Sequence, residues 1–223
     1  MSKKPLFIFG AGGASKEIYV LIKHINANKK DIKHEVIGFV ENSESSIGMH
    51  VIDNCDVVAS DGMFGEYIAN YELVEVAVPI GEPNIRKKIV DRLFSYGNIQ
   101  FPNFIHPSVI YDTSLLELGV GNIIAAGNVI GCNATLGDFN YINRSSTIGH
   151  DFDIGSYNTI NPGCNISGNV KISSQSFVGT GSTILQNIEI GDNVIIGGGA
   201  VVIESVNNNM KKVGVPAKEI KYE

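Results

Sequence analysis

The sequence lacks tryptophan, holds only three cysteines and carries few charges. Charged residues make up 18% of its 223 residues, below the ~25% typical of soluble domains. No apolar run approaches the ~20 residues that a membrane-spanning helix needs, and the opening stretch MSKKPLFIFGAGG is not typical of a secretory signal. Cys55, Cys132 and Cys164 form no C-x-x-C pair, which favours free thiols in a reducing, cytoplasmic setting.

The charge balance also argues against several partners. Seventeen basic and 23 acidic residues give a net charge of −6, with no Lys/Arg cluster, so neither nucleic acid nor an anionic membrane surface is an expected partner. No His/Cys/Asp spacing is typical of a metal site. The apolar share of 43% is enough for a folded core.

A six-residue period dominates the second half of the chain. From Leu118 to Val202, every sixth residue is Leu, Ile or Val, and glycine follows at eight of these fifteen positions. This pattern is typical of a hexapeptide β-helix. One such unit cannot bury its inward side chain alone, so the units coil and stack. Three units make an 18-residue coil, and residues 18 apart lie ~4.8 Å above one another.

The N-terminal region alternates predicted strands and helices. Residues 5–9, 35–40 and 73–78 are expected to be strands, and residues 16–27 and 84–96 helices with one apolar face. This order predicts a small parallel sheet of Rossmann type. The loop Gly10–Ser15 departs from G-x-G-x-x-G at Ser15. A glycine turn before a helix nevertheless offers N–H groups to a phosphate, whether of NAD or of a nucleotide diphosphate, and an unliganded tight turn is the alternative.

His150 differs from the four other histidines because it alone lies within the repeats. His24, His34 and His50 are expected at the surface, and His106 at the entry to the coils. The 18-residue spacing stacks Cys132, His150, Gly168 and Gln186. We expect the missing side chain of Gly168 to let a ligand reach the imidazole, with Gly168 N–H able to donate to an oxyanion that develops there.

Asp151 has two interpretations. It either supports the imidazolium of His150, or is one of a ladder of corner residues that tolerate left-handed backbone: Asn133, Asp151, Asn169 and Asn187. Asp153 is expected in a turn, and Cys132 and Cys164 as partly buried fillers. Residues 197–200 leave backbone exposed where a flat adenine could lie, and Lys211 and Lys212 could either meet the phosphates of such a ligand or simply keep the tail soluble.

Four segments together resemble a known family: FGAGGASKE, IGEPNIRKK, SSTIGHD and VGVPAK. They are similar to the hexapeptide-repeat sugar acyltransferases grouped with sialic acid O-acetyltransferase, and most similar to the bacillosamine- and perosamine-pathway N-acetyltransferases. The resemblance spans essentially the whole chain. It implies a left-handed form for the β-helix, and acetyl transfer from acetyl-CoA to the amino group of a nucleotide-linked 4-amino sugar in a homotrimer.

The resemblance also implies roles for individual residues. His150 corresponds to the catalytic base, with Asp151 where the relatives carry a glutamate. The substrate-binding positions correspond to Gly12, Gly13, Ala14, Glu41, Asn42 and Gly81. The CoA-contacting positions correspond to Thr159, Gly168, Thr180 and Gly198. Histidines stand in the bacillosamine-pathway enzymes where this chain has Ala14 and Thr159, so the exact sugar stays open.

These observations predict a Rossmann-like nucleotide-sugar domain over residues 1–103, a β-helix acyltransferase domain over 104–204 and a C-terminal tail over 205–223. O-acetylation of sialic acid or another sugar hydroxyl is the alternative reaction. A non-catalytic trimer that binds a nucleotide is a second alternative. An NAD-dependent oxidoreductase is disfavoured, since no catalytic-domain motif follows the glycine loop.

Overall fold

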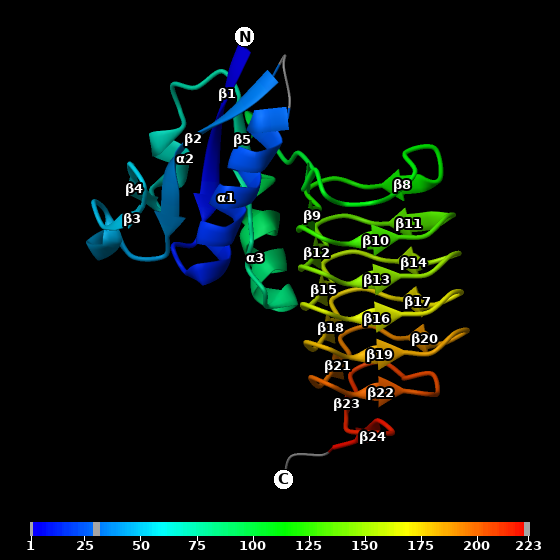
Figure 1. Cartoon of the computed structure of the whole chain (residues 1–223). Helices are drawn as coiled ribbons and strands as arrows, with labels where there is room; N and C mark the ends of the chain where they lie inside the picture. The colour runs from blue at the N-terminus through cyan, green and yellow to red at the C-terminus, as the bar shows by residue number, and fades with distance from the viewer. Residues whose placement is uncertain (1, 29–31, 221–223) are drawn as a thin grey trace. The chain divides into compact units, whose positions relative to one another are not determined.

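The computed structural model describes residues 2–28 and 32–220. The chain divides into an N-terminal unit, residues 1–81 and 85–102, and a C-terminal unit, residues 82–84 and 103–223 (Figure 1). Among the described residues, no helix combines the length and the apolar character needed to cross a membrane.

The N-terminal unit is built on one six-stranded sheet in the order β3-β4-β2-β1-β5-β6. Its strands are β1 (Ser2–Phe9), β2 (Ile32–Glu41), β3 (His50–Ile52), β4 (Cys55–Ser60), β5 (Val74–Ala77) and β6 (Ile99–Gln100). Its helices are α1 (Gly13–Asn28), the 3₁₀ helix η1 (Glu44–Ser46), α2 (Phe64–Tyr67) and α3 (Pro83–Leu93). All neighbouring strands pair in parallel except β3 with β4. The predicted Rossmann-like sheet is therefore confirmed.

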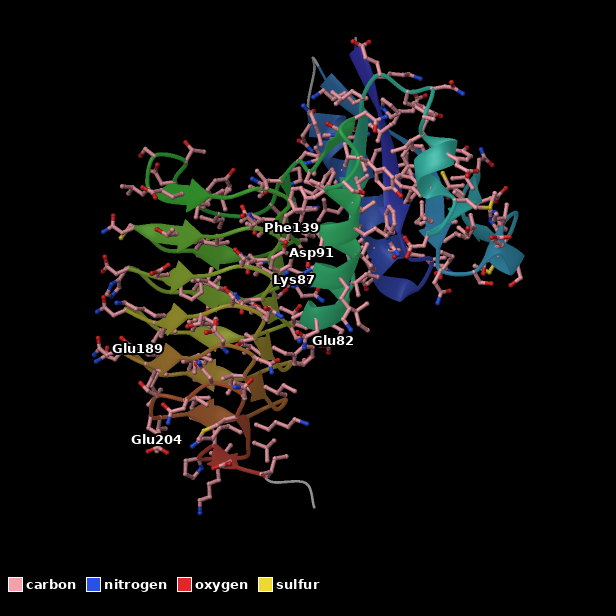
Figure 2. All side chains as sticks on the ribbon, turned by 180° about the vertical axis from the view of Figure 1, so that it is seen from behind. Glu82, Lys87, Asp91, Phe139, Glu189 and Glu204 are labelled. Atoms are coloured by element: carbon pink, nitrogen blue, oxygen red, sulfur yellow. The ribbon has the colours of Figure 1, made fainter. Side chains whose placement is uncertain are left out.

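The two long helices follow from their sequence patterns. The apolar stripe of α1 lies in the core, with Ile18, Leu21, Ile22 and Ile25 all at most 4% exposed. Proline at the first position suits α3, since its missing N–H would have no partner there. On the exposed face of α3, Lys87 Nζ and Asp91 Oδ2 form an ion pair one turn apart, at 2.6 Å (Figure 2). Such i,i+4 pairs stabilise a helix by ~0.3–0.5 kcal/mol.

His34 contradicts its prediction as a surface residue. Its side chain is 6% exposed, and Nδ1 lies 2.5 Å from Glu75 Oε2, whose own side chain is 3% exposed. Lys4 Nζ approaches the other carboxylate oxygen at 3.5 Å. His34 and Glu75 lie on β2 and β5, the two strands that flank β1. The two residues are 41 positions apart in the sequence, so local polarity alone does not reveal that they pair.

The C-terminal unit is a left-handed parallel β-helix with three sheets, as predicted (Figure 1). The first sheet contains β10 (Val129–Ile130), β13 (Thr147–Ile148), β16 (Asn165–Ile166), β19 (Thr183–Ile184) and β22 (Val201–Val202). The second contains β8 (Leu116–Leu118), β11 (Ala134–Leu136), β14 (Asp153–Ile154), β17 (Lys171–Ile172) and β20 (Glu189–Ile190). The third contains β7 (Phe104–Ile105), β9 (Ile123–Ile124), β12 (Tyr141–Ile142), β15 (Thr159–Ile160), β18 (Phe177–Val178), β21 (Ile195–Ile196), β23 (Lys211–Val213) and β24 (Lys218–Glu219).

The aliphatic period sets the register of all three sheets. In the first sheet, Ile148 pairs with Ile130 on one side and Ile166 on the other, each 18 residues away. These side chains are at most 4% exposed, so each sheet contributes one aliphatic column to the core. The outward residues of the second sheet include exposed charges such as Glu189 on β20 (Figure 2). Asp153 lies on β14, so its prediction as a turn residue is wrong.

Three corners connect the sheets. Corner A follows the first sheet (residues 131–133, 149–152, 167–170 and 185–188), and corner B follows the second (119–122, 137–140, 155–158, 173–176 and 191–194). Corner C follows the third (125–128, 143–146, 161–164, 179–182 and 197–200). The left-handed residues of corner A are Asn133, Asp151, Asn169 and Asn187, with φ of 55°, 53°, 55° and 63°. The predicted ladder of left-handed residues is confirmed.

Corner B contains a buried ladder of amide side chains. Asn140 Oδ1 accepts a hydrogen bond from Asn158 N at 2.9 Å, and Asn158 Oδ1 accepts one from Ser176 N at 2.7 Å. Asn158 Nδ2 donates to Ser173 O at 2.8 Å. The ladder therefore satisfies backbone groups that the tight corner leaves without strand partners.

Candidate functional site

His150 and Asp151 form a hydrogen-bonded pair in corner A. Asp151 adopts φ of 53°, so the chain turns between the two residues and their side chains meet. His150 Nδ1 lies 2.7 Å from Asp151 Oδ2, and Asn133 Nδ2 donates to Asp151 Oδ1 at 3.0 Å. The two interpretations of Asp151 therefore hold together: it is a corner residue, and it also contacts the imidazole.

The carboxylate of Asp151 favours one tautomer of the imidazole, with the hydrogen on Nδ1. The pKa of Asp151 is lowered from its usual value, first by the hydrogen bond from Asn133 and then by that from His150. Asp151 is therefore a carboxylate at neutral pH, and it can only accept a hydrogen bond, so the Nδ1–H of His150 donates to it. The lone pair of the ring is then on Nε2. The side chain of His150 is 60% exposed, so a ligand can reach the ring.

Gly168 lies next to the imidazole, as its 18-residue spacing predicts, but the open space expected above it is not present. The imidazole ring itself lies against Gly168 and fills the position of a side chain there. A thioester would therefore approach His150 from the solvent-exposed side of the ring. Cys132 is exposed rather than partly buried, which corrects its prediction as a filler, whereas Cys164 is fully buried.

The remaining residues assigned to CoA lie elsewhere on the β-helix. Thr180 and Gly198 are exposed neighbours in corner C, where Gly199 N donates to Thr180 O at 2.8 Å. Corner C precedes the strands of the first sheet and corner A follows them, so ~20 Å of extended chain separates the two groups. Thr159 lies on β15 and is only 1% exposed, so its side chain is not accessible to a ligand in this structure.

A pocket of about 380 Å³ lies in the N-terminal unit, at the carboxyl ends of β1, β2 and β5. All six residues predicted to bind the substrate line it: Gly12, Gly13, Ala14, Glu41, Asn42 and Gly81. Ligands of open α/β sheets bind at this edge. Asp61, Pro79 and Ile80 also line the pocket and were not predicted. Each directly follows or lies just beyond a predicted or observed strand, which is the signal that would have found them.

Glu41 holds the wall of this pocket together. Its Oε1 accepts a hydrogen bond from Ala11 N at 2.6 Å, and its Oε2 accepts one from Asn42 N at 3.2 Å. Gly10 N donates to Val40 O at 2.7 Å beside it. The carboxylate thus fixes the glycine loop to the end of β2.

The pocket offers backbone groups rather than basic side chains to an anion. None of its lining residues is Lys or Arg. Helix α1 begins at Gly13, so its first N–H groups and the positive end of its dipole face a ligand at the loop. Asp61, the other acidic residue of the lining, is paired with Arg92. Across the described parts of the chain, no group of three or more His, Cys, Asp or Glu side chains is placed to hold a metal ion.

Two protein families match the chain, in the order that the fold displays. Residues 5–93 match the PglD N-terminal domain, and residues 169–204 match the bacterial transferase hexapeptide repeats. The comparison with curated proteins gave no match.

Several solved structures are similar over nearly the full chain. The acetyltransferase domain of PglB from Neisseria gonorrhoeae, in complex with acetyl coenzyme A, is 25% identical with a TM-score of 0.85, over 98% of this chain and 100% of that one. PerB from Caulobacter crescentus, in complex with CoA and GDP-perosamine, is 25% identical with a TM-score of 0.83, over 97% of both chains. WeeI from Acinetobacter baumannii is 25% identical with a TM-score of 0.83, over 98% of this chain and 100% of that one.

The fold and the two family matches define a two-domain acyltransferase of the hexapeptide-repeat class. Within that class, the N-terminal unit matches the PglD N-terminal domain, and the whole chain is similar to the acetyltransferase domain of PglB.

Proposed function

We propose that the protein transfers the acetyl group of acetyl-CoA to the amino group of a nucleotide-linked 4-amino-deoxy sugar. The observation that carries this proposal is the exposed imidazole of His150, held at Nδ1 by the Asp151 carboxylate at 2.7 Å. The bound acetyl coenzyme A of PglB and the bound CoA and GDP-perosamine of PerB support the two substrates.

The arrangement of corner A suits direct attack of the amine on the thioester. His150 Nε2 accepts the proton that the amine loses as its nitrogen bonds to the acyl carbon. Gly168 N–H donates to the acyl oxygen as negative charge develops there. When the carbon–sulfur bond breaks, the proton passes from Nε2 to the departing thiolate. Asp151 keeps the ring oriented and stabilises the imidazolium while it exists.

The positions of the assigned CoA residues support a site shared between subunits. Thr180 and Gly198 lie in corner C, and His150 and Gly168 lie in corner A, at opposite ends of the strands of the first sheet. A single ligand would contact both groups if corner C of one copy faced corner A of another. A cyclic trimer provides three such sites by symmetry.

The pocket of the N-terminal unit suits the nucleotide diphosphate. Backbone N–H groups at Gly12, Gly13 and Ala14 are placed to hold phosphate oxygens at the start of α1. Asn42 and Gly81 line the same pocket and complete the proposed substrate site. Glu41 contributes by fixing the loop through Ala11.

Replacing Glu41 with alanine is expected to raise KM for the nucleotide sugar about tenfold, because a charge-assisted hydrogen bond to Ala11 N is lost and the loop loosens. The KM for acetyl-CoA should change little. Glu41→Gln keeps the acceptor and should recover most of the loss. The exposed Glu44 of η1 gives the matched control, Glu44→Ala. Equal KM values for Glu41→Ala and wild type would contradict this role.

Paired assays test the proposed reaction. The protein is supplied with acetyl-CoA and either a nucleotide-linked 4-amino sugar or its 4-hydroxy analogue, and free thiol is followed with time. Faster release with the amino sugar supports N-acetylation, and faster release with the hydroxyl analogue establishes O-acetylation instead. Binding of the nucleotide without any thiol release would show a non-catalytic protein.

A further inference from the structure

The glycine at position 168 is not required by the local backbone. Gly163, Gly181 and Gly199 in corner C have φ of 70°, 70° and 68°, the left-handed region that favours glycine. Gly168 is outside that region, so an alanine can adopt its backbone conformation.

The space beside Gly168 is filled by one side chain. A Cβ placed on Gly168 would lie 2.5 Å from His150 Nε2, 2.6 Å from Cε1 and 2.9 Å from Cδ2. These separations are well inside van der Waals contact, so any residue other than glycine displaces the ring. Gly149 gives a contrast, since its own Cβ would meet the backbone of Ser167 and Gly168. Glycine at position 149 therefore allows neighbouring coils to stack, whereas Gly168 leaves the space that the imidazole of His150 occupies.

The position of the ring is coupled to its hydrogen bond. The imidazole lies against Gly168 while Nδ1 is 2.7 Å from Asp151 Oδ2. The chain between the two residues is held by Asn169 N, which donates to His150 O at 2.9 Å, and by Asp151 N, which donates to Cys132 O at 2.9 Å. The backbone therefore cannot follow a displaced ring, and the ring must rotate away from the carboxylate.

We infer that Gly168 is a positioning residue for His150. Its missing side chain leaves the space in which the ring keeps Nδ1 hydrogen-bonded to Asp151 and Nε2 toward the substrate. This role rests on the proposed function, and it is separate from any contact between Gly168 and CoA. It accounts for glycine at a position where the backbone conformation does not demand it.

Gly168→Ala tests the inference. We expect kcat to fall about 10²-fold, the size of a lost general base, while the Kd for CoA stays within about twofold of wild type. In the Asp151→Gly background, where the left-handed φ of 53° is tolerated and the acceptor is removed, the same change should cost much less. Gln186→Ala, one coil further along the same column and exposed, is the matched control and should behave as wild type.

Histidine-selective NMR gives a readout that does not depend on turnover. The Cε1–H signal of His150, assigned by its loss in His150→Ala, should move in Gly168→Ala and stay in place in Gln186→Ala. An unmoved signal together with unchanged kcat would overturn the inference. So would an unmoved signal with weakened CoA binding, which would make Gly168 a cofactor contact only. If the wild type transferred acetyl to no amino sugar, the proposed function would fail, but the NMR result would still show whether Gly168 positions the imidazole of His150.

Discussion

His150→Ala is expected to lower kcat for acetyl transfer by at least about 10²-fold, equivalent to ~2.7 kcal/mol of transition-state stabilisation. In the proposed reaction the amine sheds a proton as it attacks the thioester, and His150 Nε2 is the proposed acceptor, since Nδ1 is bound to Asp151. Since the imidazole is 60% exposed and the substitution leaves the corner backbone intact, CoA binding should persist. Steady-state kinetics with the amino sugar and calorimetric titration with CoA measure the two quantities.

Two further variants make this result specific. His24→Ala removes an exposed histidine of α1 and should keep the wild-type kcat. Asp151→Asn removes the carboxylate charge but keeps an acceptor of the same length, so its kcat should lie between those of wild type and His150→Ala. Undiminished turnover in His150→Ala would show that the proton goes to another group, and the assignment of corner A as the catalytic site would then be wrong.

The β-helix was predictable because one physical requirement repeats along the sequence. Each six-residue unit must bury one aliphatic side chain, so the fifteen positions from Leu118 to Val202 mark the core directly. The same spacing identifies vertical neighbours, and this is why the stacking of His150 on Gly168 was foreseen. The orientation of the ring was not, because it depends on a rotamer that sequence spacing does not encode.

The N-terminal unit was predicted less completely. Strands β1, β2 and β5 were predicted, but β4 was not. Its sequence, CDVVAS, is short, and charged Asp56 interrupts it. Its partner β3 is an edge strand of only three residues. Such elements are defined by pairing with a neighbouring strand more than by a pattern of their own.

The contact between His150 and Asp151 shows what a local pattern leaves open. Adjacent residues on a strand point to opposite faces, so the sequence alone does not bring their side chains together. The left-handed φ of Asp151 reverses that expectation. The pair His34–Glu75 is the converse case, in which residues far apart in sequence meet across β1. The first contact depends on the backbone conformation of one residue, and the second depends on the register of the strands on either side of β1.

The internal ladder of corner B was also encoded in the sequence, in the 18-residue spacing of Asn122, Asn140 and Asn158. Polar residues inside a coil are costly unless each hydrogen-bonding group has a partner. Here each amide oxygen accepts from a backbone N–H one coil away. The ladder therefore replaces strand hydrogen bonds where the chain bends.

Asn158→Ala is consequently expected to lower the free energy of unfolding by about 3 kcal/mol. The substitution leaves the N–H of buried Ser176 without its acceptor, at ~1–3 kcal/mol, and removes the donor to Ser173 O, a group of an exposed residue. Asn165→Ala, on the exposed face of β16, removes the same amide from the surface and should cost less than about 1 kcal/mol. Chemical denaturation at one fixed protein concentration compares the variants, because assembly would otherwise shift apparent stability. Equal losses for the two variants would show that the ladder fills space rather than satisfying the backbone of the corner.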